Sequence, residues 1–196
     1  MSDTSGVARL RDLLSVPNQL TFLRLAILPF LIISIRYQRY DWALGVLLAA
    51  GLSDALDGLL ARRLSQKTAV GAYLDPIADK LLLSSSFFML ALEGKIRWWL
   101  AIIVLGRDGL MLIAAAVILL AAGYVSFPPS IWGKLTTVSQ ILMVFLVIVL
   151  AVFANPVLHM ARDACAWVVA GLTVFSGLHY SLIVARRLGT VPPPRE

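Results

Sequence analysis

Residues 51–80 read GLSDALDGLLARRLSQKTAVGAYLDPIADK, and they set four aspartates in a chain that is otherwise strongly apolar. Asp54 and Asp57 are three residues apart near the end of one predicted helix, and Asp75 and Asp79 are four apart near the start of the next. Residues at these spacings share one face of a helix. A short basic connection joins the two helices, so they can pack antiparallel and bring the four carboxylates together near one end of the pair.

The rest of the sequence is typical of a membrane protein. Of its 196 residues, 60% are hydrophobic and only 14% are charged, and the mean hydropathy is +0.87. This polar share is too small to cover a soluble domain, and several apolar runs exceed the roughly 18 residues of a membrane-spanning helix. The apolar runs are continuous and do not alternate with period two, as the strands of a membrane β-barrel do.

We therefore expect an all-α fold in which residues 1–196 form a single polytopic membrane domain. Its six predicted transmembrane helices are Leu20–Tyr37, Trp42–Leu60, Ala72–Leu92, Trp98–Ala122, Leu135–Phe153 and Ala164–Ala185. Residues 1–16 are predicted to be an interfacial segment with a short amphipathic helix. Residues 190–196 are rich in proline and are predicted to be a flexible tail.

The basic residues predict how the chain is oriented. On the side of the termini we count nine lysines and arginines, namely Arg9, Arg11, Arg62, Arg63, Lys67, Lys134, Arg186, Arg187 and Arg195. The opposite connections contain five, namely Arg36, Arg39, Lys95, Arg97 and Arg162. Because cytoplasmic loops are enriched in basic residues, we expect both termini and the aspartates on the cytoplasmic side. The net charge of +6 does not indicate nucleic-acid binding, because these residues are scattered at helix ends and form no basic stripe.

The four carboxylates predict a metal site. An aspartate at the centre of a membrane span costs about 2.5–3.5 kcal/mol, so a cluster of them needs compensating positive charge. Hard oxygen ligands with no histidine or cysteine nearby favour Mg²⁺, Mn²⁺ or Ca²⁺ over zinc. Two divalent cations suit four carboxylates, as in two-metal phosphoryl-transfer centres, where the ions hold both the attacking and the leaving oxygen.

The residues between the two aspartate pairs fit a phosphate-containing ligand. Gly58 and Gly71 have no side chain and allow a ligand to approach the backbone, and Ala61 is nearly as small. Arg62 offers a bidentate guanidinium to a phosphate oxygen. A structural role for a single buried aspartate is common, but it does not explain four aspartates with two glycines and an arginine between them.

At these residues the sequence resembles the CDP-alcohol phosphatidyltransferase family. The signature of that family is Asp-x-x-Asp-Gly-x-x-Ala-Arg, then eight residues, then Gly-x-x-x-Asp-x-x-x-Asp. Here it is filled, with every spacing intact, by Asp54, Asp57, Gly58, Ala61, Arg62, Gly71, Asp75 and Asp79. The stretch Pro17-Asn18-Gln19-Leu20-Thr21 followed by Arg24 also resembles the entry of that family into its first span, so the resemblance covers nearly the whole chain.

The resemblance implies a reaction and a set of roles. An acceptor alcohol attacks the β-phosphorus of a CDP-linked lipid, usually CDP-diacylglycerol, and CMP leaves. Asp54, Asp57 and Asp75 would bind two divalent cations, Mg²⁺ or Mn²⁺, and Asp79 would be a further ligand or the base that takes the hydroxyl proton. Gly58, Ala61 and Gly71 would line the cytidine pocket, and Arg62 would hold the diphosphate. A homodimer in the bacterial inner membrane is also implied.

The residues leave two acceptors open, and we expect glycerol 3-phosphate, the acceptor of phosphatidylglycerophosphate synthases, because that is the commoner activity. The segments Gly106-Arg107-Asp108 and Ser130 to Gln140 resemble phosphatidylglycerophosphate synthases and the related cardiolipin synthases. Asp108 and Thr136 favour a cardiolipin synthase, which uses phosphatidylglycerol, whereas Trp132-Gly133-Lys134 and Gln140 favour glycerol 3-phosphate as the acceptor. Lys134 and Arg107 are the candidates for binding an acceptor phosphate, although Lys134 could be an ordinary anchor and Arg107 could pair with Asp108.

A cation transporter is the rival from another functional class, because transporters also carry acidic residues within the membrane. The clustering of the aspartates around a basic connection and the lack of a repeated half argue against it.

Overall fold

The computed structural model describes residues 16–64, 69–122, 131–153 and 156–188. Within these ranges, the side chains of residues 16–21, 24, 53–64, 69–77, 79, 114–122, 157 and 183–188 are excepted. The predicted interfacial segment and the tail lie outside the described residues.

The described part of the chain is all α-helical, as predicted. Its six helices are α2 (Val16–Arg36), α3 (Tyr40–Leu64), α4 (Ala69–Leu92), α5 (Trp98–Ala122), α6 (Ile131–Phe153) and α7 (Pro156–Leu188). Each coincides with one predicted span, and α5 has the predicted bounds. The other five are longer than predicted. The all-helical fold class is therefore confirmed, and the boundaries are corrected.

The corrections have physical reasons. Helix α3 continues through Arg62 to Leu64, and so includes residues that we expected in a loop, because leucine, alanine and arginine are good helix formers. Helix α7 begins at Pro156 instead of Ala164, since proline suits the first turn of a helix. The polar residues that follow do not interrupt α7, because Arg162 pairs with the neighbouring Asp163 on the exposed surface.

The connections at one end of the bundle are tight. Gly94 has a φ of 68° and ends α4, with bonds from its own amide to the Ala91 carbonyl and from the Lys95 amide to the Leu90 carbonyl. This is the Schellman arrangement, in which a left-handed residue after the helix favours glycine. Just before it, Glu93 accepts a hydrogen bond from Arg36, at the end of α2, at 2.9 Å.

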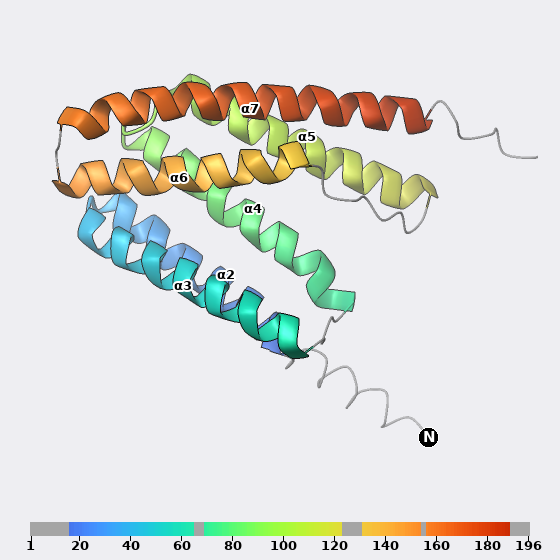
Figure 1. Cartoon of the computed structure of the whole chain (residues 1–196), viewed down its shortest axis with the longest axis horizontal. Coiled ribbons are helices and arrows are strands. Elements are labelled where there is room, and N and C mark those ends of the chain that lie inside the picture. The colour runs from blue at the N-terminus through green and yellow to red at the C-terminus, as the bar shows by residue number, and fades with distance from the viewer. Residues whose placement is uncertain (1–15, 65–68, 123–130, 154–155, 189–196) are drawn as a thin grey trace, which may run out of the picture.

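The helices run in alternating directions and diverge toward one end (Figure 1). Helix α2 packs against α3 and α4, α6 packs against α7 and α3, and α5 packs against α7 and α4. At the end where the helices are closest lie the C-terminus of α4 and the N-terminus of α5. The C-terminus of α3, the N-terminus of α4 and the C-terminus of α7 lie at the opposite, divergent end.

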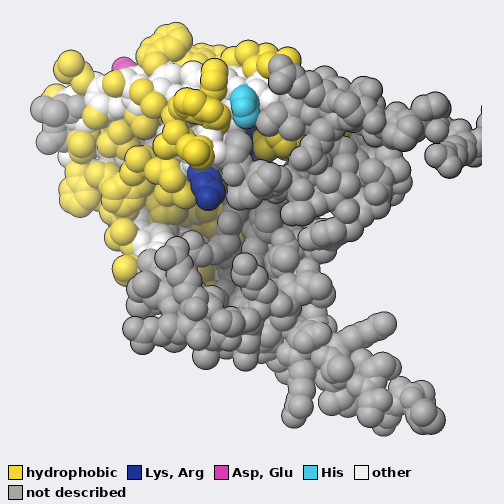
Figure 2. All heavy atoms as spheres, turned by 45° about the vertical axis from the view of Figure 1, so that its right-hand side comes forward, with side chains coloured by type: hydrophobic (Ala, Val, Ile, Leu, Met, Phe, Trp, Pro, Cys, Tyr) yellow, Lys and Arg dark blue, Asp and Glu magenta, His cyan; other side chains and the backbone are white. Residues whose placement is uncertain are grey.

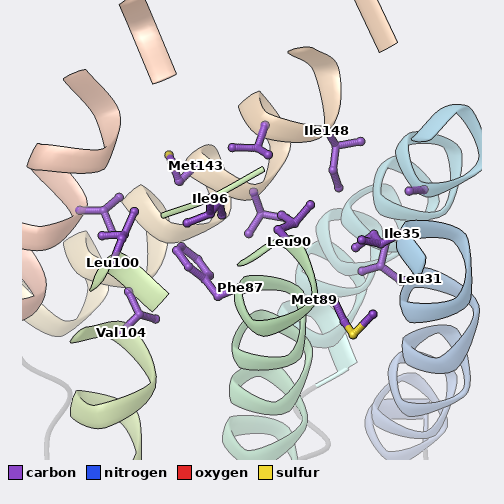
Figure 3. Packing of buried hydrophobic residues seen from close by; sticks show 14 of the residues in the cluster. Leu31, Ile35, Phe87, Met89, Leu90, Ile96, Leu100, Val104, Met143 and Ile148 are labelled. Carbon is purple, nitrogen blue, oxygen red and sulfur yellow. The ribbon is translucent and has the colours of Figure 1, made fainter. Parts of the chain in front are cut away.

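The buried hydrophobic cluster of the described residues fills the closely packed end of the bundle. Leu90 of α4 lies between Phe87 of the same helix and the side chains of Leu31 and Ile35 of α2 (Figure 3), and residues of α3, α5, α6 and α7 complete the cluster. Phe87, Leu90 and Ile35 are fully buried. Much of the rigidity of the described part thus comes from the end that is remote from the aspartates.

The outer surface of the described part is apolar. Large hydrophobic side chains such as Phe30, Ile102, Leu110 and Phe153 are more than 60% exposed, and Figure 2 shows hydrophobic side chains over most of the described face. Among the described residues, Ile131–Phe153 and Leu158–Leu182 are long and apolar enough to cross a membrane. Shorter apolar helical segments occur at Leu25–Arg36, Tyr40–Leu52 and Lys80–Leu92.

Candidate active site

The two halves of the aspartate motif lie on the consecutive helices α3 and α4, whose connected ends lie at the divergent end of the bundle (Figure 1). Asp54 and Asp57 are in the second half of α3, and Asp75 and Asp79 are in the first half of α4. The C-terminus of α3 and the N-terminus of α4 lie close together in Figure 1. The side chains of these four aspartates are outside the described ones, so their convergence on a common site stays a prediction.

The predicted ligands of the CDP moiety follow the same pattern. Gly58, Ala61 and Arg62 lie in α3 after the first aspartate pair, and Gly71 lies in the first turn of α4. The side chains of Ala61 and Arg62 are likewise outside the described ones. What the backbone provides is the common location: all eight residues of the motif belong to two helices joined by residues 65–68.

The prediction of a metal site depends on the four aspartates of α3 and α4. Among the residues with described side chains, no group of three or more histidine, cysteine, aspartate or glutamate residues lies close enough to hold a metal ion. The four aspartates of α3 and α4 fit Mg²⁺ or Mn²⁺, since both ions prefer carboxylate oxygens.

A charged network begins one residue after the motif. Lys80 of α4 donates to Oδ1 of Asp108 of α5 at 2.7 Å, and Ser84 donates to Oδ2 at 3.4 Å. Arg107 donates through Nη1 to Oδ1 of Asp108 at 2.7 Å, and through Nη2 to Oγ of Ser176 of α7 at 2.8 Å. The network therefore ties the residue next to Asp79 to two other helices.

Burial makes this network costly to disturb. The side chains of Arg107 and Asp108 are 7% and 5% exposed, and that of Lys80 is 25% exposed. Removing one partner of a buried ion pair leaves the other charge without compensation. The pairing of Arg107 with Asp108, one of the two roles that the sequence left open, is thus confirmed.

One N–H donor of Arg107 is not hydrogen-bonded to any of the described residues. Its Nε is buried and has no hydrogen-bond partner among them, whereas Nη1 and Nη2 are both engaged. Gly177 lies close to the stem of this arginine, because a Cβ at that position would be 3.5 Å from Cγ of Arg107. A buried guanidinium with a spare N–H can donate to a further oxygen ligand.

Lys134 lies in the first turn of α6 and is exposed. Its helix is joined to α7 nearby: Trp132 contacts Phe175 edge-to-face at 4.6 Å, and Thr136 donates to the carbonyl of Leu172 at 3.2 Å. Since Arg107 bonds to Ser176, the residue after Phe175, a single stretch of α7, residues 172–176, positions both predicted acceptor-binding residues.

Two members of this network are not predicted by the sequence. Lys80 stands out only as a charge within a span, and its position directly after Asp79 could have indicated an intramembrane ion pair. Ser176 gives no signal, because a serine between phenylalanine and glycine is unremarkable until α7 packs on α5.

Comparisons with known proteins agree with the motif. A model of the CDP-alcohol phosphatidyltransferase family matches residues 14–177. A Mycobacterium tuberculosis protein named "Probable phosphatidylglycerophosphate synthase" is 30% identical over 96% of this chain and 90% of its own length. A "CDP-diacylglycerol--glycerol-3-phosphate 3-phosphatidyltransferase" of Aquifex aeolicus is 32% identical over 86% of this chain and 95% of its own.

A relative named for a different product is equally similar. "Cardiolipin synthase (CMP-forming)" of Streptomyces coelicolor is 33% identical over 83% of this chain and 72% of its own length. Both activities are therefore consistent with the similarity, and the transporter alternative is replaced by an enzyme class. With the aspartate motif complete and the match extending over most of its length, the chain belongs to the CDP-alcohol phosphatidyltransferase family.

Proposed function

We propose that this enzyme transfers the phosphatidyl group of CDP-diacylglycerol to glycerol 3-phosphate and releases CMP. The observation that carries the proposal is the complete eight-residue motif on two consecutive helices, whose connected ends lie at the divergent end of the bundle. The acceptor hydroxyl oxygen forms a bond to the β-phosphorus, the bond from that phosphorus to the CMP oxygen breaks, and the hydroxyl proton passes to a carboxylate.

Each residue of the motif has a role in this proposal. Asp54, Asp57 and Asp75 hold two divalent cations, which when bound neutralise the diphosphate charge. Asp79 is a further ligand or takes the proton of the attacking hydroxyl. Arg62 donates to the diphosphate. The three small residues leave room for the cytidine, and these are Gly58, Ala61 and Gly71. The protein mainly positions the reactants and stabilises charge.

Arg107 and Lys134 are proposed to bind the phosphate of the acceptor. The spare buried Nε–H of Arg107 and the exposed ammonium of Lys134 are both held near the same stretch of α7. A phosphate monoester carries about two negative charges at neutral pH, so it gains more from two cations than an uncharged alcohol does. The relatives named as phosphatidylglycerophosphate synthase and as glycerol-3-phosphate 3-phosphatidyltransferase also match over more of their own length than the Streptomyces coelicolor cardiolipin synthase does.

Cardiolipin synthesis from phosphatidylglycerol is the second candidate, and Thr136 is the residue that favours it. Thr136 is fully buried and its hydroxyl bonds to carbonyls of Trp132 and Leu172. Thr136 is uncharged, whereas a lysine at this position would add a positive charge to the proposed acceptor region. A singly charged phosphodiester acceptor needs less positive charge.

The setting proposed for this chemistry is a bacterial inner membrane that the chain crosses six times, with the active site and both termini cytoplasmic. The family is membrane-bound, and the two long apolar helices and the exposed apolar surface support the proposal. A homodimer is proposed as well. Gly45 is exposed, and a Cβ added to it would have no atom within 4 Å, so its surface on α3 is open to a second chain.

An acceptor panel tests the proposed function. Purified protein is given labelled CDP-diacylglycerol with glycerol 3-phosphate, phosphatidylglycerol, inositol or serine in turn, and the lipid product is identified. We expect phosphatidylglycerophosphate with glycerol 3-phosphate and no product with inositol or serine. Cardiolipin formed only with phosphatidylglycerol would replace our choice of acceptor by the second candidate.

A further inference from the structure

A charged pocket lies at the closely packed end of the bundle, away from the aspartates. It has a volume of about 260 Å³ and lies between the start of α5 and the first turns of α7. Its polar lining consists of Lys95, Arg97, Arg162 and Asp163. None of these residues has a role in the proposed reaction.

The charge of this pocket is positive. Three basic side chains face one carboxylate, and Asp163 is already engaged by Arg162 at 2.8 Å. Lys95 lies over the ring of Tyr40, 5.1 Å from its centroid, and Arg97 is exposed. Helix α5 begins at Trp98, beside these cations, and has no acidic residue in its first turn. The partial positive charge of a helix N-terminus favours an anion at such a place.

The apolar part of the lining indicates a lipid instead of a free anion. Trp99 and Trp167 contact each other at 5.1 Å between ring centroids and flank the basic residues. Trp167 is 69% exposed on the outer surface of α7. Leu100 and Met143 form a buried apolar floor. Tryptophans next to basic residues are typical of the level of phospholipid head groups.

The length of α4 places this pocket at the opposite membrane surface. From Asp75 to its end at Leu92 the helix rises about 26 Å at 1.5 Å per residue, which is close to the roughly 30 Å of the hydrocarbon core. A helix that has the aspartates at one membrane surface therefore ends near the other surface, where Lys95 and Arg97 follow.

We propose that this pocket binds the phosphate group of an anionic phospholipid from the leaflet opposite to the active site. The cations bind the phosphate, and the acyl chains lie along the exposed surface beside Trp167. The inference depends on the membrane location of the family and is independent of the acceptor that the enzyme uses.

Quenching by brominated lipids tests the proposal. Trp42, Trp98 and Trp132 are replaced by phenylalanine, so that Trp99 and Trp167 report on the pocket. The protein is reconstituted in phosphatidylcholine bilayers with increasing brominated phosphatidylglycerol or brominated phosphatidylcholine. We expect brominated phosphatidylglycerol to quench the fluorescence of Trp99 and Trp167 at a several-fold lower mole fraction than brominated phosphatidylcholine. Arg97→Gln with Arg162→Gln should reduce this preference by about fivefold for each basic side chain lost.

Arg39→Gln is the matched control, because Arg39 is exposed at the same end of the bundle and does not line the pocket. It should keep the preference. If the double variant does not fold, Arg97→Gln alone removes an exposed cation and should reduce the preference by about fivefold. Equal quenching by the two lipids, or an equal loss in Arg39→Gln, would overturn the proposal. So would loss of the preference on adding millimolar inorganic phosphate at constant ionic strength, because the ligand would then be free phosphate.

Discussion

Among the described residues, two arginine–aspartate pairs are adjacent in sequence and differ in burial. Arg107 and Asp108 lie within the bundle, 7% and 5% exposed, and bond further to Lys80 and Ser176. Arg162 and Asp163 lie on the surface of α7, and Asp163 is 58% exposed. The buried pair should therefore contribute much more to the free energy of unfolding than the exposed pair.

Replacing Asp108 by asparagine should destabilise the fold strongly. The change leaves Lys80 and Arg107 without their carboxylate, and breaking a buried ion pair in this way costs about 3–5 kcal/mol. Asp163→Asn, the surface control, should cost less than about 1 kcal/mol. Unfolding by sodium dodecyl sulfate in mixed micelles, followed by circular dichroism, measures both free energies. Equal losses for the two variants would contradict the structural role of Asp108.

Asp79→Asn should abolish turnover while CDP-diacylglycerol still binds. If Asp79 takes the hydroxyl proton, its loss should lower the rate of CMP release by about 10²–10⁴-fold. Asp41→Asn, at the far end of α3, should leave that rate unchanged. The measurements are CMP release and the binding of labelled CDP-diacylglycerol. CMP release by Asp79→Asn at the rate of the unaltered enzyme would remove Asp79 from the role of base.

At the scale of elements, one hydroxyl group joins α6 to α7. Thr136 is fully buried and donates to carbonyls of Trp132 and Leu172, whereas the next residue, Thr137, donates within its own helix to Gly133. The two threonines differ in whether their hydrogen bonds cross between helices.

Thr136→Val should therefore lower the free energy of unfolding by about 1 kcal/mol, the usual net value of a hydrogen bond. Thr137→Val should change it little, because its bond lies within a single helical turn. The same detergent titration applies to both variants. A loss in Thr137→Val as large as that in Thr136→Val would show that the contact with α7 is not what Thr136 contributes.

The sequence was sufficient to predict the helices but not how they meet. Long apolar runs separated by polar connections placed all six helices of the described part within a few residues at most ends. The start of α7 was wrong by the largest margin, because Arg162 and Asp163 resemble a loop until they pair with each other. The contact of Arg107 with Ser176 depends on packing between residues far apart in sequence, and no local pattern reveals it.

In the candidate site, too, the sequence was sufficient to identify the residues but not the contacts between helices. Spacing and residue type identified the eight motif positions, and the helices carry them at a common end of the bundle. The pairing of Arg107 with Asp108 followed from adjacency. The link from Asp108 to Lys80 did not, because it requires α4 and α5 to be antiparallel neighbours in a given register.

The molecule as a whole has two unlike ends. At one end the buried hydrophobic cluster, the tight turn at Gly94 and the pair of Arg36 with Glu93 fix the helices together. At the other end the helices diverge (Figure 1), and the aspartate motif lies on two of them. A closely packed end opposite the proposed substrate site is an arrangement suited to binding a lipid between the divergent helix ends.

Reporter fusions test the orientation that the distribution of basic residues predicts. We expect green fluorescent protein attached after Glu196 to fluoresce, and alkaline phosphatase at the same position to be inactive, since both termini are predicted to be cytoplasmic. Alkaline phosphatase inserted after Arg39 should be active. The reverse pattern would place the aspartates on the outer surface, away from cytoplasmic substrates.

The central claim is that aspartates from α3 and α4 hold divalent cations for a reaction of a CDP-linked lipid. Electron paramagnetic resonance of Mn²⁺ tests it most directly, by counting the ions bound to the purified protein in the presence of CDP-diacylglycerol. We predict about two bound ions per chain, fewer in Asp57→Asn and Asp75→Asn, and an unchanged number in Asp163→Asn. Mn²⁺ binding that is absent from the unaltered protein, or that is the same in all four proteins, would contradict the claim.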